Sequence, residues 1–225
     1  MPMRTGDRGL IRELNVAIVM RVIRERQPVS RAEVAAVTGL SQATVTAISS
    51  RLLADGLIVE LGRGEPTKGR RPILLGFNAQ SRFCVGVKLA ADAVTAGVGD
   101  LGGNLIDTVT MPLPKTTAGI LDALEQSVRD TVRHAAVNLG SVLGLGVALP
   151  GIVDPEQGVS VVAPWHPWSQ LPLRELLQHR LGLPTFLEND ANAFALAERW
   201  FGAGQGYDHL IGVMVSAGIG AGIII

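Results

Sequence analysis

The chain has 225 residues, and its 20 Lys and Arg residues balance its 20 Asp and Glu residues, so the net charge is zero. With 47% apolar and 18% charged residues, the composition predicts a folded protein of one or two domains and excludes a disordered or fibrous chain. No apolar run is long enough to span a bilayer, and the first residues lack the pattern of a secretory signal. We therefore expect a cytoplasmic protein with no membrane partner.

The cysteine content limits the kinds of site that the chain can hold. A single cysteine, Cys84, excludes an internal disulfide framework and a zinc site built from several cysteines of this chain. Cys84 lies in the apolar run FCVGV, so we expect it in the buried core. We expect no bound metal and no cofactor.

The neutral total charge conceals an uneven distribution along the chain. Residues 1–79 carry 12 Lys and Arg against 7 Asp and Glu, an excess of +5. Residues 80–225 carry 8 against 13, a balance of −5. A basic module followed by an acidic remainder indicates that a contact with nucleic acid would lie in the N-terminal part.

The first predicted element is a helix over residues 9–26. Its large apolar residues recur at spacings of three and four, so they should form one face that packs on the following helices. These residues are Ile11, Leu14, Ile18 and Val22. The helix should end before Pro28, because proline disfavours helical backbone in the residue that precedes it.

Residues 30–56 predict two short helices joined by a tight turn. Ser30, with Glu33 three residues later, has the pattern of a capping box, and Gly39 supplies the backbone freedom of a sharp turn. Ser41 is a good cap for the second helix. The residues expected to point inward are Val34 and Val37 in the first helix and Val45, Ile48 and Leu52 in the second.

The opposite side of the second helix is small and polar, which suits a helix that enters the major groove of DNA. A strand, a loop rich in Gly and positive charge, and a returning strand follow over residues 57–78, the order of a winged helix-turn-helix. The helix residues predicted to contact DNA are Ser41, Gln42, Thr44, Thr46, Ser50 and Arg51. The wing residues predicted to contact phosphates or the minor groove are Arg63, Lys68, Arg70 and Arg71. A helical domain of another kind and a solvated surface hairpin are the alternative interpretations.

Beyond residue 79 the sequence changes character. The runs FCVGVKLA, VTAGVGD and NLIDTVTMP predict a three-stranded antiparallel meander. Buried strands, VLGLGVALPG and PTFLEND, alternate with helices expected over residues 120–139, 173–181 and 191–201. This alternation indicates an α/β sheet with ligand chemistry at the strand ends. The last 17 residues predict an apolar hairpin, and because it ends without a polar tail we expect a second α/β lobe to be missing.

Together these segments resemble the ROK family, which joins sugar-responsive repressors and sugar kinases on one actin-like (ribonuclease H-like) α/β fold. The matches are GVALPGIVD (146–154), WSQLPLRELLQHRLGLP (168–184), LENDANAFALAERWFGAG (187–204) and SAGIGAGIII (216–225). The N-terminal segment, with its GRRP wing end, is similar to that of the family's repressor branch. The resemblance therefore implies a winged helix-turn-helix DNA-binding domain over residues 1–79 and an incomplete sugar-kinase-like N-terminal lobe over residues 80–225.

The resemblance also implies a ligand site. In the kinases of the family, the residue that matches Asp190 is the general base, and the residue that matches Asn189 bonds sugar hydroxyls, as a carboxylate and an amide can. Gly151 would let the backbone approach the ligand. The alternative is that Asn189 and Asp190 simply cap the helix that begins at Ala191, and the capping and sugar-binding roles are compatible with each other. In a plain α/β fold, Gly151 would be only a turn. The neighbours expected to be structural are Glu188 and Asn192.

The phosphate loops depart from the kinase pattern. The first kinase loop resembles Asp-x-Gly-x-Thr, whereas this chain reads VGVKLAADAVTAGV with Lys88 near the place of the Asp. The second has Ser216-Ala217-Gly218 where a Thr beside glycine is expected. Bulkier side chains obstruct the approach of phosphates to backbone N–H groups. We therefore expect no catalytic residue, although Asp190 matches the kinase base.

The loop before the helix expected over residues 173–181 does not identify which sugar would bind. Trp165 replaces an Asn that the family sometimes has there. His166 and Trp168 either stack on a sugar or pack within the loop.

The sequence thus predicts a sugar-responsive transcriptional regulator, a repressor of carbohydrate metabolism genes. Its expected partners are a double-stranded DNA operator, a sugar or phosphosugar, and further copies of the chain in a homo-oligomer. The ligand would change DNA affinity allosterically, by favouring one arrangement of the protein. The alternatives are an ATP-dependent sugar kinase of the family and a truncated remnant that senses nothing.

Overall fold

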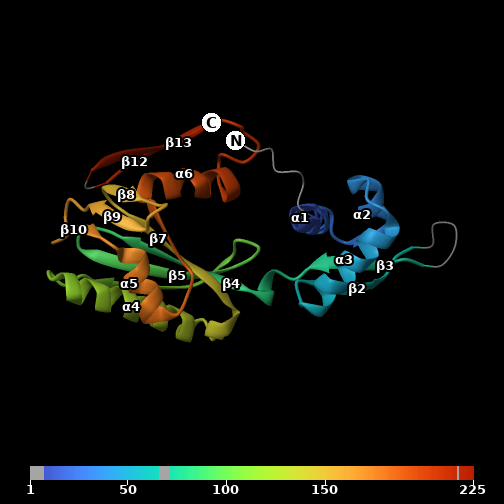
Figure 1. Cartoon of the computed structure of the whole chain (residues 1–225), viewed down its shortest axis with the longest axis horizontal. Helices are drawn as coiled ribbons and strands as arrows, with labels where there is room; N and C mark the ends of the chain where they lie inside the picture. Colours follow the sequence, from blue (N-terminus) through green and yellow to red (C-terminus); the bar gives the residue numbers. More distant parts are fainter. Residues whose placement is uncertain (1–7, 66–70, 217) are drawn as a thin grey trace. The chain divides into compact units, whose positions relative to one another are not determined.

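The computed structural model describes residues 8–65, 71–216 and 218–225, with the backbone alone for Arg8 (Figure 1). The chain divides into two compact units, Met1–Ser81 and Arg82–Ile225. Each unit has its own hydrophobic core. Among the described residues, no helix is both long and apolar enough to cross a membrane.

The first unit combines three helices with a small antiparallel sheet. The strands lie in the order β1-β3-β2, so the hairpin of β2 and β3 extends a sheet that begins before the second helix. The elements are α1 (Arg8–Arg26), β1 (Val29–Ser30), α2 (Arg31–Thr38), α3 (Gln42–Ala54), β2 (Ile58–Arg63) and β3 (Ile73–Phe77). A short 3-10 helix, Ala79–Ser81, follows.

The helix boundaries of this unit follow from local hydrogen bonds. Ser30 and Glu33 form the predicted capping box, and the hydrogen bonds from Ser30 lower the pKa of the Glu33 carboxyl. Gly39 ends α2 with φ +70°, a left-handed conformation that suits glycine. Ser41 caps α3 by accepting from the N–H of Thr44. These predictions are confirmed.

The core of the first unit differs from the prediction for α1. Val22 is buried, but Ile11, Leu14 and Ile18 are 51%, 53% and 40% exposed. The buried side of the helix is instead formed by Val19, Val22 and Ile23, so it is rotated about the helix axis relative to the predicted apolar face. The helix is apolar around much of its circumference, so periodicity alone could not identify the side that meets the core.

The inward residues of the helix pair are largely as predicted. Val34, Val45, Ile48 and Leu52 are buried. Val37 is 43% exposed, so its predicted inward position is wrong. It lies in the last turn of an eight-residue helix, which contributes Val34 and Ala35 to the core instead.

The second unit is built on a five-stranded mixed sheet in the order β11-β7-β4-β5-β6. Strands β4, β5 and β6 form the predicted antiparallel meander, and β7 and β11 lie parallel to β4. The strands are β4 (Phe83–Leu89), β5 (Ala93–Asp100), β6 (Leu105–Pro112), β7 (Val142–Leu149) and β11 (Thr185–Asn189). Parallel β4, β7 and β11 end at one edge, where ligand sites of α/β sheets commonly lie.

Helices α4 and α5 cover one face of this sheet, and α6 lies on the other side (Figure 1). They span Thr117–His134, Leu173–Leu181 and Asp190–Phe201. The predicted helix over 120–139 therefore begins and ends too late, because Thr116 caps α4 through the N–H of Gly119 and a short 3-10 helix, Leu139–Ser141, precedes β7. Leu124 and Val128 of this helix are buried against the sheet.

Two smaller sheets complete the unit. One has the order β10-β9-β8, with strands β8 (Ile152–Asp154), β9 (Val159–Val162) and β10 (Ser169–Leu171). The other is the predicted hairpin of β12 (Leu210–Val215) and β13 (Ile219–Ile224). Its glycines allow close packing on α6, since a Cβ at Gly222 would lie 2.3 Å from the carbonyl oxygen of Ala191.

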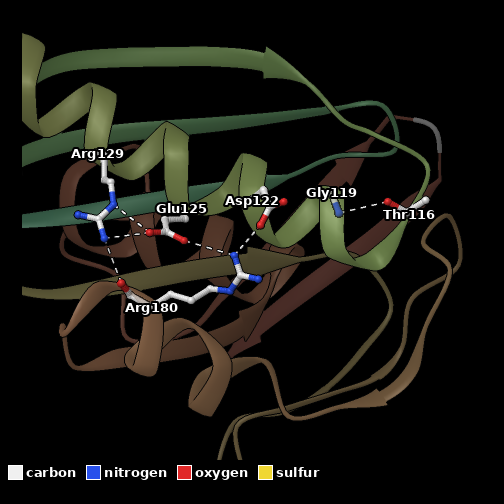
Figure 2. Close-up of polar contacts among 6 residues, drawn as sticks. All are labelled: Thr116, Gly119, Asp122, Glu125, Arg129 and Arg180. Carbon is white, nitrogen blue, oxygen red and sulfur yellow. Dashed lines mark hydrogen bonds and ion pairs between the residues drawn. The ribbon is translucent and has the colours of Figure 1, made fainter.

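A network of ion pairs joins α4 to α5 (Figure 2). The guanidinium of Arg180 lies 2.7 Å from Asp122 and 3.3 Å from Glu125. Arg129 also binds Glu125, at 2.9 Å, and donates to the carbonyl oxygen of Arg180. This network fixes α5 against α4.

Cys84 does not lie in the core. Along β4, Val85, Val87 and Leu89 are buried, whereas Cys84 and Lys88 face the other side of the strand and are exposed. The predicted strand is correct, but the alternation of side chains puts Cys84 on the face opposite α4. Partial burial there still raises the pKa of its thiol.

Candidate functional site

The exposed side of α3 carries most of the helix residues predicted to contact DNA. Val45, Ile48 and Leu52 hold its other side in the core. The exposed residues are Ser41, Gln42, Thr46, Ser50 and Arg51, and Thr44 is half-buried. The helix therefore presents a small polar surface, of a kind that fits a nucleic-acid groove.

These side chains differ in how far they are already engaged. The hydroxyl of Ser41 accepts from the Thr44 N–H at 3.1 Å and lies 2.9 Å from the Thr44 hydroxyl. Arg51 lies 3.7 Å from Asp55 in an exposed pair. Gln42, Thr46 and Ser50 have no side-chain hydrogen bond among the residues that the structure describes, so their polar groups can bind an outside partner. Ser41 and Thr44, in contrast, are engaged in the cap of α3.

The predicted wing is described only at its base. Arg63 at the end of β2 and Arg71 just before β3 are both exposed. They flank the loop, which is closed at its base by a hydrogen bond from the Gly64 N–H to the carbonyl of Pro72. Lys68 and Arg70 lie outside the described residues.

Sequence reasoning missed Arg31 at the start of α2. Its Nε donates to the Ser49 hydroxyl at 3.0 Å, and its guanidinium lies 3.4 Å from Glu60. It therefore links α2, α3 and β2, and its partners, separated from it by 18 and 29 residues, gave no local signal. Arg31 supports the surface rather than extending it.

In the second unit, the structure brings Gly151, Asn189 and Asp190 together. Asn189 Nδ2 donates to the carbonyl of Gly151 at 3.0 Å. Its Oδ1 accepts from the N–H groups of Ala191 and Asn192, so it caps α6. Most of the hydrogen-bonding capacity of Asn189 is thus used inside the protein. Its capping role is present, and its contact with a sugar stays a prediction.

Asp190 is less engaged than its neighbour. One carboxylate oxygen accepts from the Ala191 N–H at 3.0 Å, and the other has no hydrogen bond within the described part of the chain. Glu188 accepts from the backbone of Asn189 and the side chain of Asn192, as expected of structural residues. Asp190 is therefore the carboxylate best placed to accept from a ligand hydroxyl.

Gly151 is required by the fold itself. Its φ is +88°, and a Cβ there would lie 2.1 Å from the carbonyl oxygen of Val162. The turn after β7 therefore passes close to β9, so this glycine is needed whether or not a ligand approaches it.

Gly151, Asn189 and Asp190 line a cavity of about 360 Å³, which we call the Asp190 pocket. The ends of β7 and β11, the hairpin turn between β12 and β13, and Pro164 and Trp165 form its walls. The cavity lies at the carboxyl ends of parallel strands and combines an indole with a carboxylate, an arrangement suited to a small polar ligand.

His166 and Trp168 pack on each other. Their rings are stacked with centroids 4.9 Å apart at an interplanar angle of 20°, and Trp168 Nε1 donates to Ser160 at 3.0 Å. Trp168 is partly buried and packs against the core of the second unit, which is the packed-loop arrangement, and stacking of these rings on a sugar stays a prediction. Trp165, in contrast, is 45% exposed and lines the Asp190 pocket.

The region that matches the first kinase phosphate loop is a tight turn between β4 and β5. The Ala90 N–H donates to the carbonyl of Ala93 within this turn. Lys88 lies on the exposed face of β4 and lines an apolar groove of about 890 Å³ with Gly86, Gly97 and Gly146.

Comparison with known proteins identifies the family. Residues 84–225 match the sequence profile of the ROK family, which covers more than half of the chain. The chain belongs to the ROK family. This ROK protein is 32% identical to the xylose repressor of Caldicellulosiruptor bescii over 222 residues, or 98% of this chain and 56% of that protein. It is also 33% identical to the Escherichia coli K12 DNA-binding transcriptional dual regulator NagC over 220 residues, covering 97% and 54%.

Solved structures agree with this assignment. The crystal structure of a ROK family transcriptional regulator, a homolog of the E. coli MLC protein, superposes with a TM-score of 0.80 at 26% identity, over 96% of this chain and 55% of that one. A ROK family glucokinase from Streptomyces griseus gives a TM-score of 0.59 at 36% identity, over 64% and 44%. This ROK protein therefore shares the actin-like fold of family regulators and kinases, and it spans about half the length of the curated relatives it matches.

Proposed function

We propose that this ROK protein is a sugar-responsive transcriptional regulator, a repressor of carbohydrate metabolism genes. The observation that carries the proposal is how far along the chain each similarity extends. Relatives named as repressors align with 97–99% of the chain, including the first unit. The glucokinase aligns with 64%, the share held by the 144 residues of the second unit. The first unit is thus the part that accompanies regulation rather than catalysis.

We assign residues 1–79 as a winged helix-turn-helix. The pair α2 and α3, joined by a turn at Gly39, would be the helix-turn-helix, and the β2–β3 hairpin would be the wing. Gln42, Thr46 and Ser50 can bond base edges in the major groove. The wing cations would bind phosphates, which gives affinity without sequence preference. These cations are Arg63, Lys68, Arg70 and Arg71.

We assign residues 80–225 as the sensing domain, with Asp190 as the main ligand contact. The unengaged oxygen of its carboxylate would accept a sugar hydroxyl in the Asp190 pocket, and Trp165 would cover an apolar face of the sugar ring. One relative named above is a xylose repressor, and another relative, 33% identical over 97% of this chain, is named the N-acetylglucosamine repressor of Escherichia coli O6:H1. These two sugars and their phosphates are therefore the first to test. Ligand binding would change operator affinity in a homo-oligomer, since operators mirror two-fold symmetry.

The alternative function is an ATP-dependent sugar kinase, which the similarity to the glucokinase favours. Lys88 argues against it. A lysine ammonium near the place of the expected Asp cannot ligate Mg²⁺, which prefers carboxylate and phosphate oxygens. Asp190 would then be a ligand contact without phosphoryl transfer.

The test measures DNA binding and ATP turnover on the same purified chain. The DNA is the region upstream of its own gene, with a scrambled duplex as control, and xylose and N-acetylglucosamine are added in turn. Sequence-preferring, salt-dependent binding that one sugar changes supports the regulator. Sugar-dependent ATP turnover without DNA binding would establish the kinase, and DNA binding that no sugar alters would establish a protein that does not sense.

A further inference from the structure

Ser49 is a buried polar residue inside α3, the helix whose exposed side carries the proposed base contacts. It is 0% exposed. Its hydroxyl donates to the carbonyl oxygen of Thr46 at 3.1 Å and accepts from Nε of Arg31 at 3.0 Å. A buried hydroxyl costs free energy unless it is hydrogen-bonded. These two bonds therefore account for a serine on the core-facing side of the helix.

The position of Ser49 within α3 links it to DNA recognition. Thr46, whose carbonyl oxygen Ser49 bonds, lies about one helical turn earlier, and Ser50 follows it directly. The side chains of Thr46 and Ser50 are both exposed. The hydrogen bond from Arg31 therefore acts, from the buried side of the helix, on the turn that carries two of the proposed base contacts.

Arg31 has a second partner outside the helix pair. Its Nη2 donates to Oε1 of Glu60 at 3.4 Å, on strand β2, which leads into the predicted wing. A guanidinium is planar and its N–H groups point in fixed directions, so it can hold two acceptors in one defined geometry. Arg31 thus relates the position of α3 to the position of β2.

The apolar core does not fix the rotation of α3 as sharply as a hydrogen bond does. Val45, Ile48 and Leu52 anchor the helix by burial, which is not directional. A hydrogen bond to a base edge needs a donor–acceptor distance of roughly 2.7–3.2 Å, so a small displacement weakens it. Phosphate contacts contribute affinity but carry no sequence information directly. A displaced α3 would therefore lose sequence preference before it lost affinity for DNA.

We propose that Arg31 is a positioning residue for DNA recognition. Through Ser49 and Glu60 it holds the exposed side of α3 at a fixed orientation to β2. It thereby raises the preference of the protein for its operator over other DNA, without contacting DNA itself. This inference rests on the proposed DNA-binding function and adds to it a residue that lies behind the recognition surface.

The test measures the affinity of the full chain for operator and scrambled duplexes by fluorescence anisotropy over a salt series, with thermal unfolding of each variant. Arg31→Met keeps a long side chain and removes both hydrogen bonds, and Ser49→Ala removes the buried hydroxyl. Glu60→Ala changes a side chain that is 46% exposed, so it tests the same role if R31M does not fold. Arg133→Met, which removes an arginine paired with Asp130 in the second unit, is the matched control.

We expect R31M to lower the ratio of operator affinity to scrambled affinity about tenfold, within the range for one lost base contact. The salt slope should stay unchanged, because no phosphate contact is removed. S49A and E60A should also lower the ratio. The double variant R31M/S49A should lower it no further than R31M, because both changes act on one bond. R133M should leave the ratio unchanged.

Three results would overturn the inference while leaving DNA binding intact. The first is a wild-type ratio in folded R31M and E60A. The second is equal weakening on both duplexes with a smaller salt slope, because Arg31 would then be a phosphate contact. The third is an additive loss in R31M/S49A, which would exclude an effect through Ser49. A wild type with no preference for the operator would overturn the proposed DNA-binding function and the inference with it.

Discussion

Asn189 Nδ2 donates a hydrogen bond of 3.0 Å to the carbonyl oxygen of Gly151, which joins the end of β11 to the turn after β7. The same side chain caps α6 through its Oδ1. The adjacent Asp190 therefore begins the helix with one carboxylate oxygen still unengaged by the described residues. One residue of the pair holds the site together, and the other is available to a ligand.

This division of roles predicts different results for two neighbouring substitutions. Asn189→Ala removes the cap and the link to Gly151, so it should lower the free energy of unfolding by about 1–2 kcal/mol. Asp190→Asn should change stability little but weaken sugar binding about tenfold or more, because the charged carboxylate acceptor is removed. Denaturant unfolding and calorimetry on both variants measure the two effects. Equal loss of stability in both variants would show that Asp190 is also structural.

The turn at Gly151 predicts an unusually costly glycine substitution. Gly151→Ala meets the strain of its positive φ and also a clash with the carbonyl of Val162. Gly182→Ala is the matched control, since its φ is +68° and nothing lies within 4 Å of the added Cβ. G182A should cost about 1–2 kcal/mol from backbone strain alone, and G151A clearly more. Thermal unfolding of the two variants measures both losses of stability. Equal losses in G151A and G182A would contradict the close approach of Gly151 to Val162.

The exposed side of α3 predicts a loss of sequence preference. Thr46→Ala and Ser50→Ala should each reduce discrimination between operator and scrambled DNA, by about 1–3 kcal/mol for a base-contacting residue, with folding unchanged. Ser41→Ala should instead lower stability by about 0.5–2 kcal/mol, because it removes the cap of α3. Competition binding and thermal unfolding separate these effects. Full operator preference in T46A and S50A would show that α3 does not read the bases.

The cations at the base of the wing predict a change in salt dependence. Arg63→Ala with Arg71→Ala should weaken binding to every DNA sequence and reduce the slope of log affinity against log salt by about 0.9 for each phosphate that the protein no longer neutralises. Arg133→Ala with Arg199→Ala, two helix arginines of the second unit, is the control. Fluorescence anisotropy over a salt series gives the slope. If both double variants reduced the slope equally, the effect would come from total charge rather than from the wing.

The buried imidazole predicts a pH dependence of stability. Burial lowers the pKa of folded His166 below the unfolded value of about 6.5. As the pH falls below 6.5, the unfolded chain binds a proton that the folded chain resists, so stability decreases, by at most about 1.4 kcal/mol per pH unit. Unfolding followed between pH 8 and 5 should show this decrease in the wild type and a smaller one in His166→Phe. Parallel curves for the two proteins would exclude this contribution.

Local sequence patterns predicted the helices and strands better than they predicted which faces of these elements are buried. The capping box of Ser30 and Glu33 and the α6 cap at Asn189 depend on residues within one helical turn, and both are present. The alternation in β4 correctly predicted a strand. It could not show that Cys84 faces away from α4, because residues distant in sequence decide which face of a strand is covered. In the same way, the sequence of α1 could not show that Ile11, Leu14 and Ile18 lie on its exposed side.

The candidate site was predictable only in part. The resemblance to ROK proteins placed Gly151, Asn189 and Asp190 near one another, and the structure brings them together. The division of labour between Asn189 and Asp190 depends on hydrogen bonds that no spacing reveals. The stacking of His166 on Trp168 lies in a loop held by hydrogen bonds from Trp168 to Ser160 and from Thr117 of α4 to Pro167, residues that are distant in sequence.

In the proposed mechanism, a sugar bound at Asp190 changes the affinity of this protein for DNA. The most direct measurement titrates operator DNA with the wild type and with Asp190→Asn, each with and without the sugar that binds most tightly. We predict that the sugar shifts the DNA affinity of the wild type at least about fivefold, the lower end of allosteric coupling, while D190N binds DNA normally and does not respond. A sugar response of equal size in D190N, or its absence from the wild type, would contradict sugar sensing at Asp190.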